Sequence, residues 1–174
     1  MKITYLGTGA AEGIPALFCN CDYCKGVKRA GGALVRSRSQ IIIDGELGID
    51  FPPDCFYHAA ARGVDLSAIR YLLVTHSHMD HFYAHDFILR GYKYAQGLTS
   101  DVLNIYGNAE VKVVFEECTR RELRPEIGET ILLHTLAPFE EVSFGQWRVN
   151  TLKAQHSSHD PLLFLLEKGD KRIL

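Results

Sequence analysis

Residues 75–81 read THSHMDH and place three imidazoles and one carboxylate in a single short segment. Neutral imidazole and carboxylate are good ligands for zinc and similar divalent ions. His76 and His78 stand two positions apart in a nearly extended segment, so they project to the same side and can share one ion. Asp80 and His81 follow where the chain begins to turn, and we expect them at a neighbouring ion. Two ions about 3.5–4 Å apart can clamp both the attacking and the leaving oxygen of a displacement. The segment therefore predicts a dinuclear hydrolytic centre, with Asp80 and His81 as its catalytic residues.

A second group of potential metal ligands lies near the amino terminus, at Cys19, Cys21 and Cys24. Three thiolates on a tight loop suit tetrahedral zinc with a fourth ligand from elsewhere in the chain. Cysteines this close together make poor disulfide partners in a reducing compartment. We predict one structural zinc ion here, and the alternative is three buried or free thiols.

The elements around these groups alternate between strand and helix, which predicts an α/β fold. Residues 71–74 (YLLV) are continuously apolar and short, as in a strand that is buried on both faces. The metal-binding segment would then lie at the end of this strand, where open sheets usually keep their sites. We predict strands at 2–6, 39–44, 70–75, 102–106, 129–134, 141–145, 147–154 and 162–167, and helices at 22–30, 53–62, 84–95 and 109–122.

The motif at residues 75–81 resembles that of the metallo-β-lactamase superfamily. Residues 3–9 (ITYLGTG), followed by Gly13-Ile14-Pro15, are similar to the opening strand and glycine turn of one branch. That branch includes the phosphodiesterase accessory protein of the carbon–phosphorus lyase pathway and, more distantly, the tRNA-maturing endoribonucleases. The resemblance implies an αβ/βα sandwich with the metals at one edge of two packed sheets. It extends over essentially the whole chain, so we expect residues 1–174 to form a single domain.

The resemblance also implies roles for residues outside the metal-binding segment. Asp44, which ends the predicted strand 39–44, resembles the aspartate that orients a ligand histidine. A histidine after the strand at 148–153 would complete the trio around the first ion. His156 sits directly at the end of that strand and is our choice, with His159 as the alternative. The active-site ions would be zinc, or else manganese or iron. In the related branch, cysteines in the same loop as here hold a structural zinc together with a distant histidine.

The last residues predict that the fold is truncated at its carboxy terminus. Residues 171–174 begin a strand that returns beside 162–167, and an unpaired apolar edge is one that native proteins avoid. In the family this returning strand leads to an aspartate that bridges both metals and to a final histidine. We therefore expect three ligands for the first ion and two for the second. A homodimer could cover the exposed edge.

Three functions are compatible with these features. The first is a metal-dependent phosphodiesterase that uses a metal-bound hydroxide to hydrolyse small or cyclic nucleotide-like phosphodiesters. The second is a thioesterase or lactonase of the same superfamily, and the third is a non-catalytic module that binds metal or nucleic acid. Arg36 and Arg38, near the cysteine loop, are candidates for holding a substrate phosphate through two hydrogen bonds.

Composition limits the partners. The chain has 174 residues, 47% of them apolar, and a formal net charge of −2, which suits one globular domain with a real core. The negative net charge disfavours a nucleic-acid partner, because phosphate contacts need a concentrated basic surface. No stretch is long and apolar enough to span a membrane, and the first residues do not form a signal peptide. The cysteine usage favours the cytoplasm.

Overall fold

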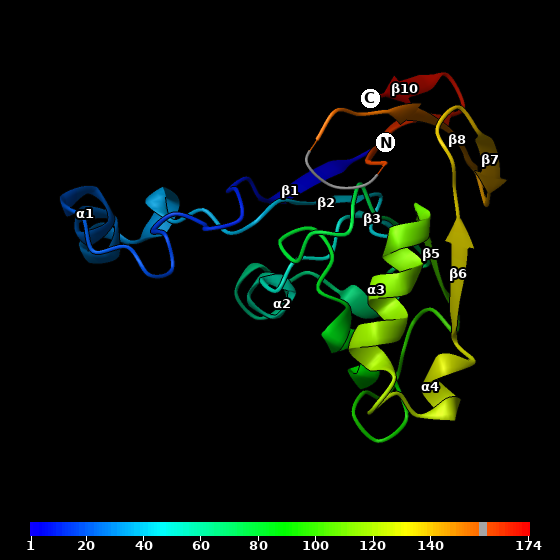
Figure 1. The fold of residues 1–174 in the computed structure, drawn as a ribbon, viewed down its shortest axis with the longest axis horizontal. Helices are drawn as coiled ribbons and strands as arrows, with labels where there is room; N and C mark the ends of the chain where they lie inside the picture. Colours follow the sequence, from blue (N-terminus) through cyan, green and yellow to red (C-terminus); the bar gives the residue numbers. More distant parts are fainter. Residues whose placement is uncertain (157–159) are drawn as a thin grey trace.

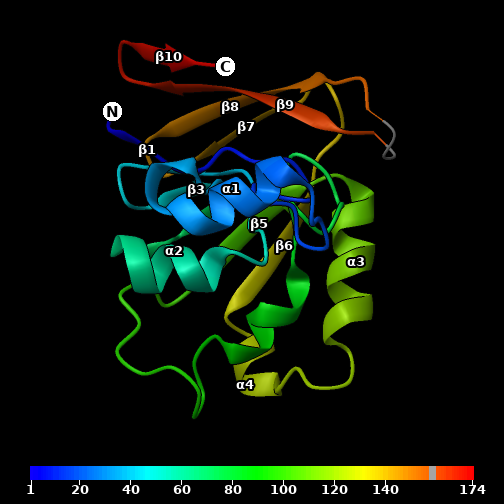
Figure 2. The ribbon, with the colours of Figure 1, turned by 90° about the vertical axis from the view of Figure 1, so that its left-hand side faces the viewer.

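The computed structural model describes residues 1–156 and 160–174, which build two sheets. The larger sheet contains, in spatial order, β1 (Ile3–Gly7), β2 (Gln40–Ile43), β3 (Leu47–Ile49), β4 (Tyr71–Leu73), β5 (Leu103–Gly107) and β6 (Ile131–Thr135). Its first three strands are antiparallel, and β3 to β6 run parallel. The smaller, antiparallel sheet contains β10 (Lys171–Ile173), β9 (Leu162–Lys168), β8 (Trp147–Lys153) and β7 (Glu141–Phe144). It lies above the larger sheet in Figure 2.

Helices cover the face of the larger sheet that points away from the smaller one (Figure 1). They are α2 (Cys55–Arg62), α3 (Ala109–Thr119) and α4 (Pro125–Gly128), together with short 3₁₀ helices at Leu66–Ala68 and Ala84–Leu89. Within the described ranges, none of the helices has the length and apolar character needed to cross a membrane.

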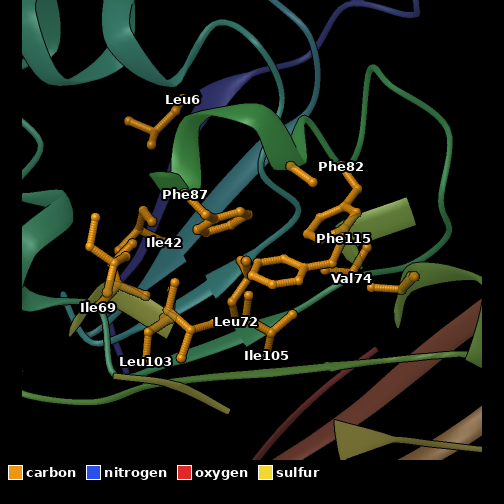
Figure 3. Packing of buried hydrophobic residues seen from close by; sticks show 14 residues of the cluster. Leu6, Ile42, Ile69, Leu72, Val74, Phe82, Phe87, Leu103, Ile105 and Phe115 are labelled. Carbon is orange, nitrogen blue, oxygen red and sulfur yellow. The ribbon is translucent and has the colours of Figure 1, made fainter. Parts of the chain in front are cut away.

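Strand β4 is buried on both faces, as its apolar sequence predicts. Leu72 joins Ile105 and Phe115 in the cluster between the sheet and the helices, which Figure 3 shows. Leu73 points the other way and joins Trp147 in the cluster between the two sheets. Because successive side chains of a strand alternate, β4 is held by both cores, and its carboxyl end is fixed accordingly.

The connection between β1 and β2 forms an arm that extends away from the sheets (Figure 1). Its two sides are paired near the base, where the Gly9 amide donates to the Ser37 carbonyl (2.7 Å). At Gly7 a Cβ atom would stand 1.8 Å from the carbonyl oxygen of Arg38, so only glycine permits this approach. The arm carries helix α1 (Asp22–Ala30) and a 3₁₀ helix at Gly32–Leu34.

Two differences from the sequence prediction lie next to the metal-binding segment. The helix predicted over 84–95 is wrong: only the 3₁₀ helix Ala84–Leu89 forms, and left-handed residues follow at Gly91 (φ 88°) and Tyr92 (φ 53°). The Arg90 guanidinium holds this turn by donating to the carbonyl of Ser100 (2.6 Å). Strand β3 has no counterpart in the prediction, because three residues around Gly48 carry too little pattern to indicate a strand.

Candidate metal centre

Three histidines from two distant segments meet at the carboxyl end of β4. The side chains of His76, His78 and His156 each offer a nitrogen atom, and these atoms all lie within 4.8 Å of one another. The ring centroids of His76 and His156 are 4.5 Å apart, and those of His76 and His78 are 4.8 Å apart. A group of three imidazoles with this spacing could hold a divalent ion.

The buried ring of His76 tests whether an ion fits this group. Its Nδ1 lies 3.0 Å from the hydroxyl oxygen of Thr75. Its Nε2 is buried and has no hydrogen-bond partner among the described residues. Burial, followed by the nearby His81, His156 and His78, lowers the pKa of His76 to about 4. The ring is therefore neutral at physiological pH and can present an unprotonated nitrogen. An unmatched buried acceptor is costly, and a metal ion in the trio would satisfy it.

Asp80 and His81 form a second pair of potential metal ligands beside the trio. The carbonyl of His78 accepts hydrogen bonds from the amides of His81 (2.9 Å) and Phe82 (2.8 Å), which bends the chain into a tight turn. The turn places the Nε2 of His81 3.3 Å from the Oδ2 of Asp80. The rings of His76 and His81 lie 4.1 Å apart, so the two groups of potential ligands are adjacent.

Asp50, which was not among the predicted site residues, holds the metal-binding segment in place through hydrogen bonds to Thr75 and His81. Its Oδ2 accepts a hydrogen bond from the Nδ1 of His81 (2.6 Å), and its Oδ1 accepts from the amide (2.8 Å) and the hydroxyl (2.9 Å) of Thr75. Burial by itself lowers the pKa of His81, but the hydrogen bond and charge of Asp50, with Asp80, outweigh it and raise the pKa. The contact leaves the Nε2 of His81 to face the metal position.

The assignment of this bracing role to Asp44 is wrong. Asp44 lies in the turn between β2 and β3, where its carboxylate accepts from the amide of Lys2 (2.6 Å) and the ammonium of Lys168 (2.9 Å). The missed strand β3 is the reason: the chain turns at Asp44, runs through β3, and reaches the metal edge only at Asp50. The parallel pairing of β3 with β4 then sets Asp50 beside Thr75. An acidic residue directly after the run Leu47–Ile49 was the available signal.

Hydrogen bonds at both ends hold the connection that carries His156. The amide of Leu162 donates to the carbonyl of Thr75 (2.8 Å), and the amide of Ala154 donates to the carbonyl of Pro161 (3.0 Å). Asn108, which caps α3, also donates from its side-chain amide to the carbonyl of Asp160 (2.8 Å). His156, three residues beyond the end of β8, thus lies close to His76 and His78, and its role as a metal ligand remains a prediction. The alternative, His159, lies outside the described residues.

The three cysteines of the arm also come together. The Sγ atoms of Cys19, Cys21 and Cys24 lie within 4.8 Å of one another, and none of the three is in a disulfide. The Sγ of Cys21 caps α1 by accepting from the amide of Cys24 (3.5 Å). Hydrogen bonds from the Cys24 backbone and from the Cys19 and Cys24 side chains lower the pKa of Cys21 to about 7. A thiol that ionises this readily is suited to binding zinc.

The two arginines proposed to hold phosphate lie at the base of the arm. The guanidinium of Arg38 pairs with Asp54 (3.1 Å) and donates to the carbonyl of Ala11 (3.0 Å), so its charge is already matched within the fold. Arg36 donates to the hydroxyl of Thr8 (3.0 Å). Both line a cavity of about 180 Å³ on the arm. A role for Arg36 or Arg38 in substrate binding remains a prediction.

The chain belongs to the metallo-beta-lactamase superfamily, whose family model matches residues 37–174. Its fold is similar to that of Zn²⁺-bound PqqB from Methylobacterium extorquens, with a TM-score of 0.71 and 19% identity over 98% of this chain and 60% of that one. A diphosphatase of the PhnP family gives a TM-score of 0.71 and 20% identity over 99% of this chain and 64% of that one. The short form of human tRNase Z gives a TM-score of 0.67 and 17% identity over 99% of this chain and 67% of that one. These likenesses confirm the predicted metallo-β-lactamase-type α/β fold.

One curated relative matches part of the sequence. It is an octanoyltransferase from Porphyromonas gingivalis, 32% identical over 85 residues, which make up 47% of this chain and 16% of that protein. The chain therefore spans a small part of this relative and less than two thirds of the first two structures named above.

Proposed function

We propose that this chain is the metal-binding part of a phosphodiesterase that hydrolyses small or cyclic nucleotide-like phosphodiesters at a dinuclear metal centre. The observation that carries the proposal is the buried, unmatched Nε2 of His76, which lies within a trio of imidazoles beside a second pair of potential ligands. A metal ion would give these groups, which gather at the end of a buried strand, a common partner.

Each residue has a distinct task in this proposal. His76, His78 and His156 would hold one ion, and Asp80 and His81 would hold the other. When bound by these residues, two divalent ions would lower the pKa of water toward about 7 and would offset negative charge on the phosphoryl oxygens. Asp50 keeps the Nδ1 of His81 protonated, so that the Nε2 remains available as a ligand. Zinc suits this set of nitrogen and oxygen ligands, and manganese or iron would also be accepted.

Three arguments support a phosphodiester as the substrate. The similar structures include a diphosphatase of the PhnP family and a tRNase Z, and phosphoester chemistry is what those names describe. The net charge of −2 favours a small substrate over a polynucleotide, because nucleic-acid binding depends on many phosphate contacts. The opening strand and glycine turn also resemble the branch that contains the phosphodiesterase of the carbon–phosphorus lyase pathway.

The test is hydrolysis of bis(p-nitrophenyl) phosphate by the metal-loaded protein. We expect turnover that a chelator abolishes and that His78→Ala lowers by at least about a hundredfold, since removing a ligand disrupts one ion's site. The control is Lys153→Ala, which changes an exposed side chain at the end of β8. Metal binding without turnover of any ester would instead support the non-catalytic module.

A second candidate is hydrolysis of an acyl thioester. The observation in its favour is the partial match to an octanoyltransferase, whose name describes transfer of an acyl group. The same ions can polarise a carbonyl as readily as a phosphoryl oxygen. Activity on an octanoyl thioester that exceeds activity on bis(p-nitrophenyl) phosphate would favour this candidate.

We also propose that Cys19, Cys21 and Cys24 hold a structural zinc ion on the arm, which fits a reducing compartment such as the cytoplasm. Elemental analysis distinguishes this ion from those at the histidines. We expect Cys21→Ser to remove zinc from the arm and leave the ions at the histidines, and His78→Ala to do the opposite. Equal metal content in Cys21→Ser and the unmodified protein would rule out the arm site.

A further inference from the structure

A chain of buried hydrogen bonds runs behind the metal centre, through side chains that have no place among the ligands. It begins at Ser37 at the base of the arm, passes through His58 on α2 and Gln40 on β2, and ends at the backbone of Asp50. His58 and Gln40 are 0% exposed, and Asp50 is 3% exposed. Buried polar groups are costly unless they are fully paired, so this chain of contacts calls for an explanation.

Each bond in the chain has a defined direction. The amide nitrogen of Gln40 donates to the carbonyl of Asp50 (3.2 Å) and to the Sγ of Cys55 (3.2 Å), so the amide oxygen must be an acceptor. That oxygen accepts from the Nδ1 of His58 (2.6 Å). Burial lowers the pKa of His58, so the ring is neutral and its Nε2 carries no proton. The Nε2 therefore accepts from the hydroxyl of Ser37 (2.7 Å), which lies farther from its other acceptor, the Leu6 carbonyl (3.3 Å).

The end of this chain is a residue in an unusual conformation. Asp50 has φ of 62°, in the left-handed region that residues other than glycine, asparagine and aspartate seldom adopt. Two backbone contacts hold it there: its amide donates to the Leu73 carbonyl (2.9 Å), and its carbonyl accepts from Gln40. The direction of the Asp50 carboxylate, and hence of the His81 ring, depends on this backbone geometry.

We propose that Gln40 and His58 are positioning residues for the metal centre, which fix the His81 ring through the backbone of Asp50. Neither touches a ligand, and each acts by constraining the next group. The inference rests on the proposed function only for its effect on metal binding, because the orientation of His81 exists with or without an ion.

The variants separate this role from general stability. Gln40→Met keeps the length of the side chain and removes its hydrogen bonds. His58→Asn keeps an N–H donor where the Nδ1 stands, and His58→Leu removes it. Thr119→Val is the matched control: Thr119 is 1% exposed, its hydroxyl donates to the Phe115 carbonyl (2.8 Å), and it lies at the far end of α3.

The first measurement is ¹⁵N NMR of the histidine rings in the metal-free protein at alkaline pH, where the rings are neutral. We expect a single Nδ1-protonated tautomer for His81 in the unmodified protein, in His58→Asn and in Thr119→Val. Gln40→Met and His58→Leu should give a mixture of tautomers. A single Nδ1-protonated tautomer in those two variants, with the fold intact, would overturn the proposal.

The second measurement is metal affinity, determined by competition with a chromophoric chelator. We expect Gln40→Met and His58→Leu to lower the affinity for the ion at Asp80 and His81 about tenfold. This is the lower end of the range for groups that orient ligands. His58→Asn and Thr119→Val should bind as the unmodified protein does. If the unmodified protein binds no metal, the proposed function fails while the NMR result still decides the inference. A loss of affinity in Thr119→Val as large as that in Gln40→Met would refute the positioning role.

Discussion

Asp50 is the side chain on which the orientation of the metal-binding segment depends most directly. It contacts His81 and Thr75 at the same time, from a position directly after β3 that is 25 residues or more away along the chain. An aspartate in this position fixes which nitrogen of His81 is protonated. In the proposed centre it would also strengthen that ring as a ligand.

Replacing Asp50 by asparagine tests this contact. Asparagine also tolerates a left-handed backbone, so Asp50→Asn removes the charge with little strain. We expect metal affinity to fall by about 10–100-fold, as is typical when a group that orients a ligand is lost. Asp44→Asn is a matched control, because Asp44 also has a left-handed backbone (φ 52°) but contacts Lys2 and Lys168. Equal metal affinity in the two variants would contradict the assignment.

The residues that could be predicted from sequence lie in a short motif or directly after a recognisable strand. His76, His78, Asp80 and His81 lie within six positions, and a strand followed by a turn is enough to bring them together. His156 could be placed because a strand leads directly to it. Asp50 could not, because its role follows from the pairing of β3 with β4, and that pairing is a contact in space.

Strand β4 is the element that connects the core to the metal centre. It is central in the larger sheet, and its residues alternate between two apolar clusters. Burial on both faces requires an almost purely apolar sequence, which is why this strand was predicted well. The neighbouring 84–95 segment has helical periodicity, but the hydrogen bonds of Arg90 and the left-handed Gly91 end the helix early.

Truncating Leu73 tests how strongly β4 is held. Leu73 is 0% exposed between the two sheets, so Leu73→Ala should lower the free energy of unfolding by about 2–5 kcal/mol. The control is Leu132→Ala on β6, where the side chain is 46% exposed and the loss should stay below about 1 kcal/mol. Urea denaturation followed by tryptophan fluorescence measures both. Similar losses in the two variants would show that β4 is not buried as described.

At the scale of the whole molecule, polar contacts join the two sheets at the edge away from the metal centre. Lys168 on β9 reaches across to Asp44 (2.9 Å) and Glu46 (3.4 Å), which belong to the turn of the larger sheet. Its ammonium also lies 4.6 Å from the centroid of the Trp147 ring. These contacts supplement the apolar cluster between the sheets.

The contact between Lys168 and Asp44 predicts how the free energy of unfolding depends on pH. The hydrogen bonds from Lys168 and from the Lys2 amide lower the pKa of Asp44 below its ordinary value. The stabilising contribution is therefore complete above the pKa of an unfolded aspartate, and it is lost as the pH falls through the lower, folded-state pKa. We expect Asp44→Asn to lower the free energy of unfolding by up to about 1 kcal/mol at neutral pH. The difference should vanish in acid, as measured by urea denaturation across pH. A difference that persists in acid would mean that charge is not its cause.

The register between β3 and β4 also governs where the chain can change in length. Ile49 pairs with Leu73, and Asp50, the residue directly after β3, supplies the carboxylate beside Thr75 and His81. A single insertion or deletion between Ile43 and Leu47 would move Leu47 and Ile49 to the opposite faces and carry that carboxylate out of reach. Residues 92–97 are mostly exposed and lie outside both sheets, where added length disturbs no strand pairing. Evolution can therefore lengthen this protein at its periphery, whereas the short turn after β2 must keep its number of residues.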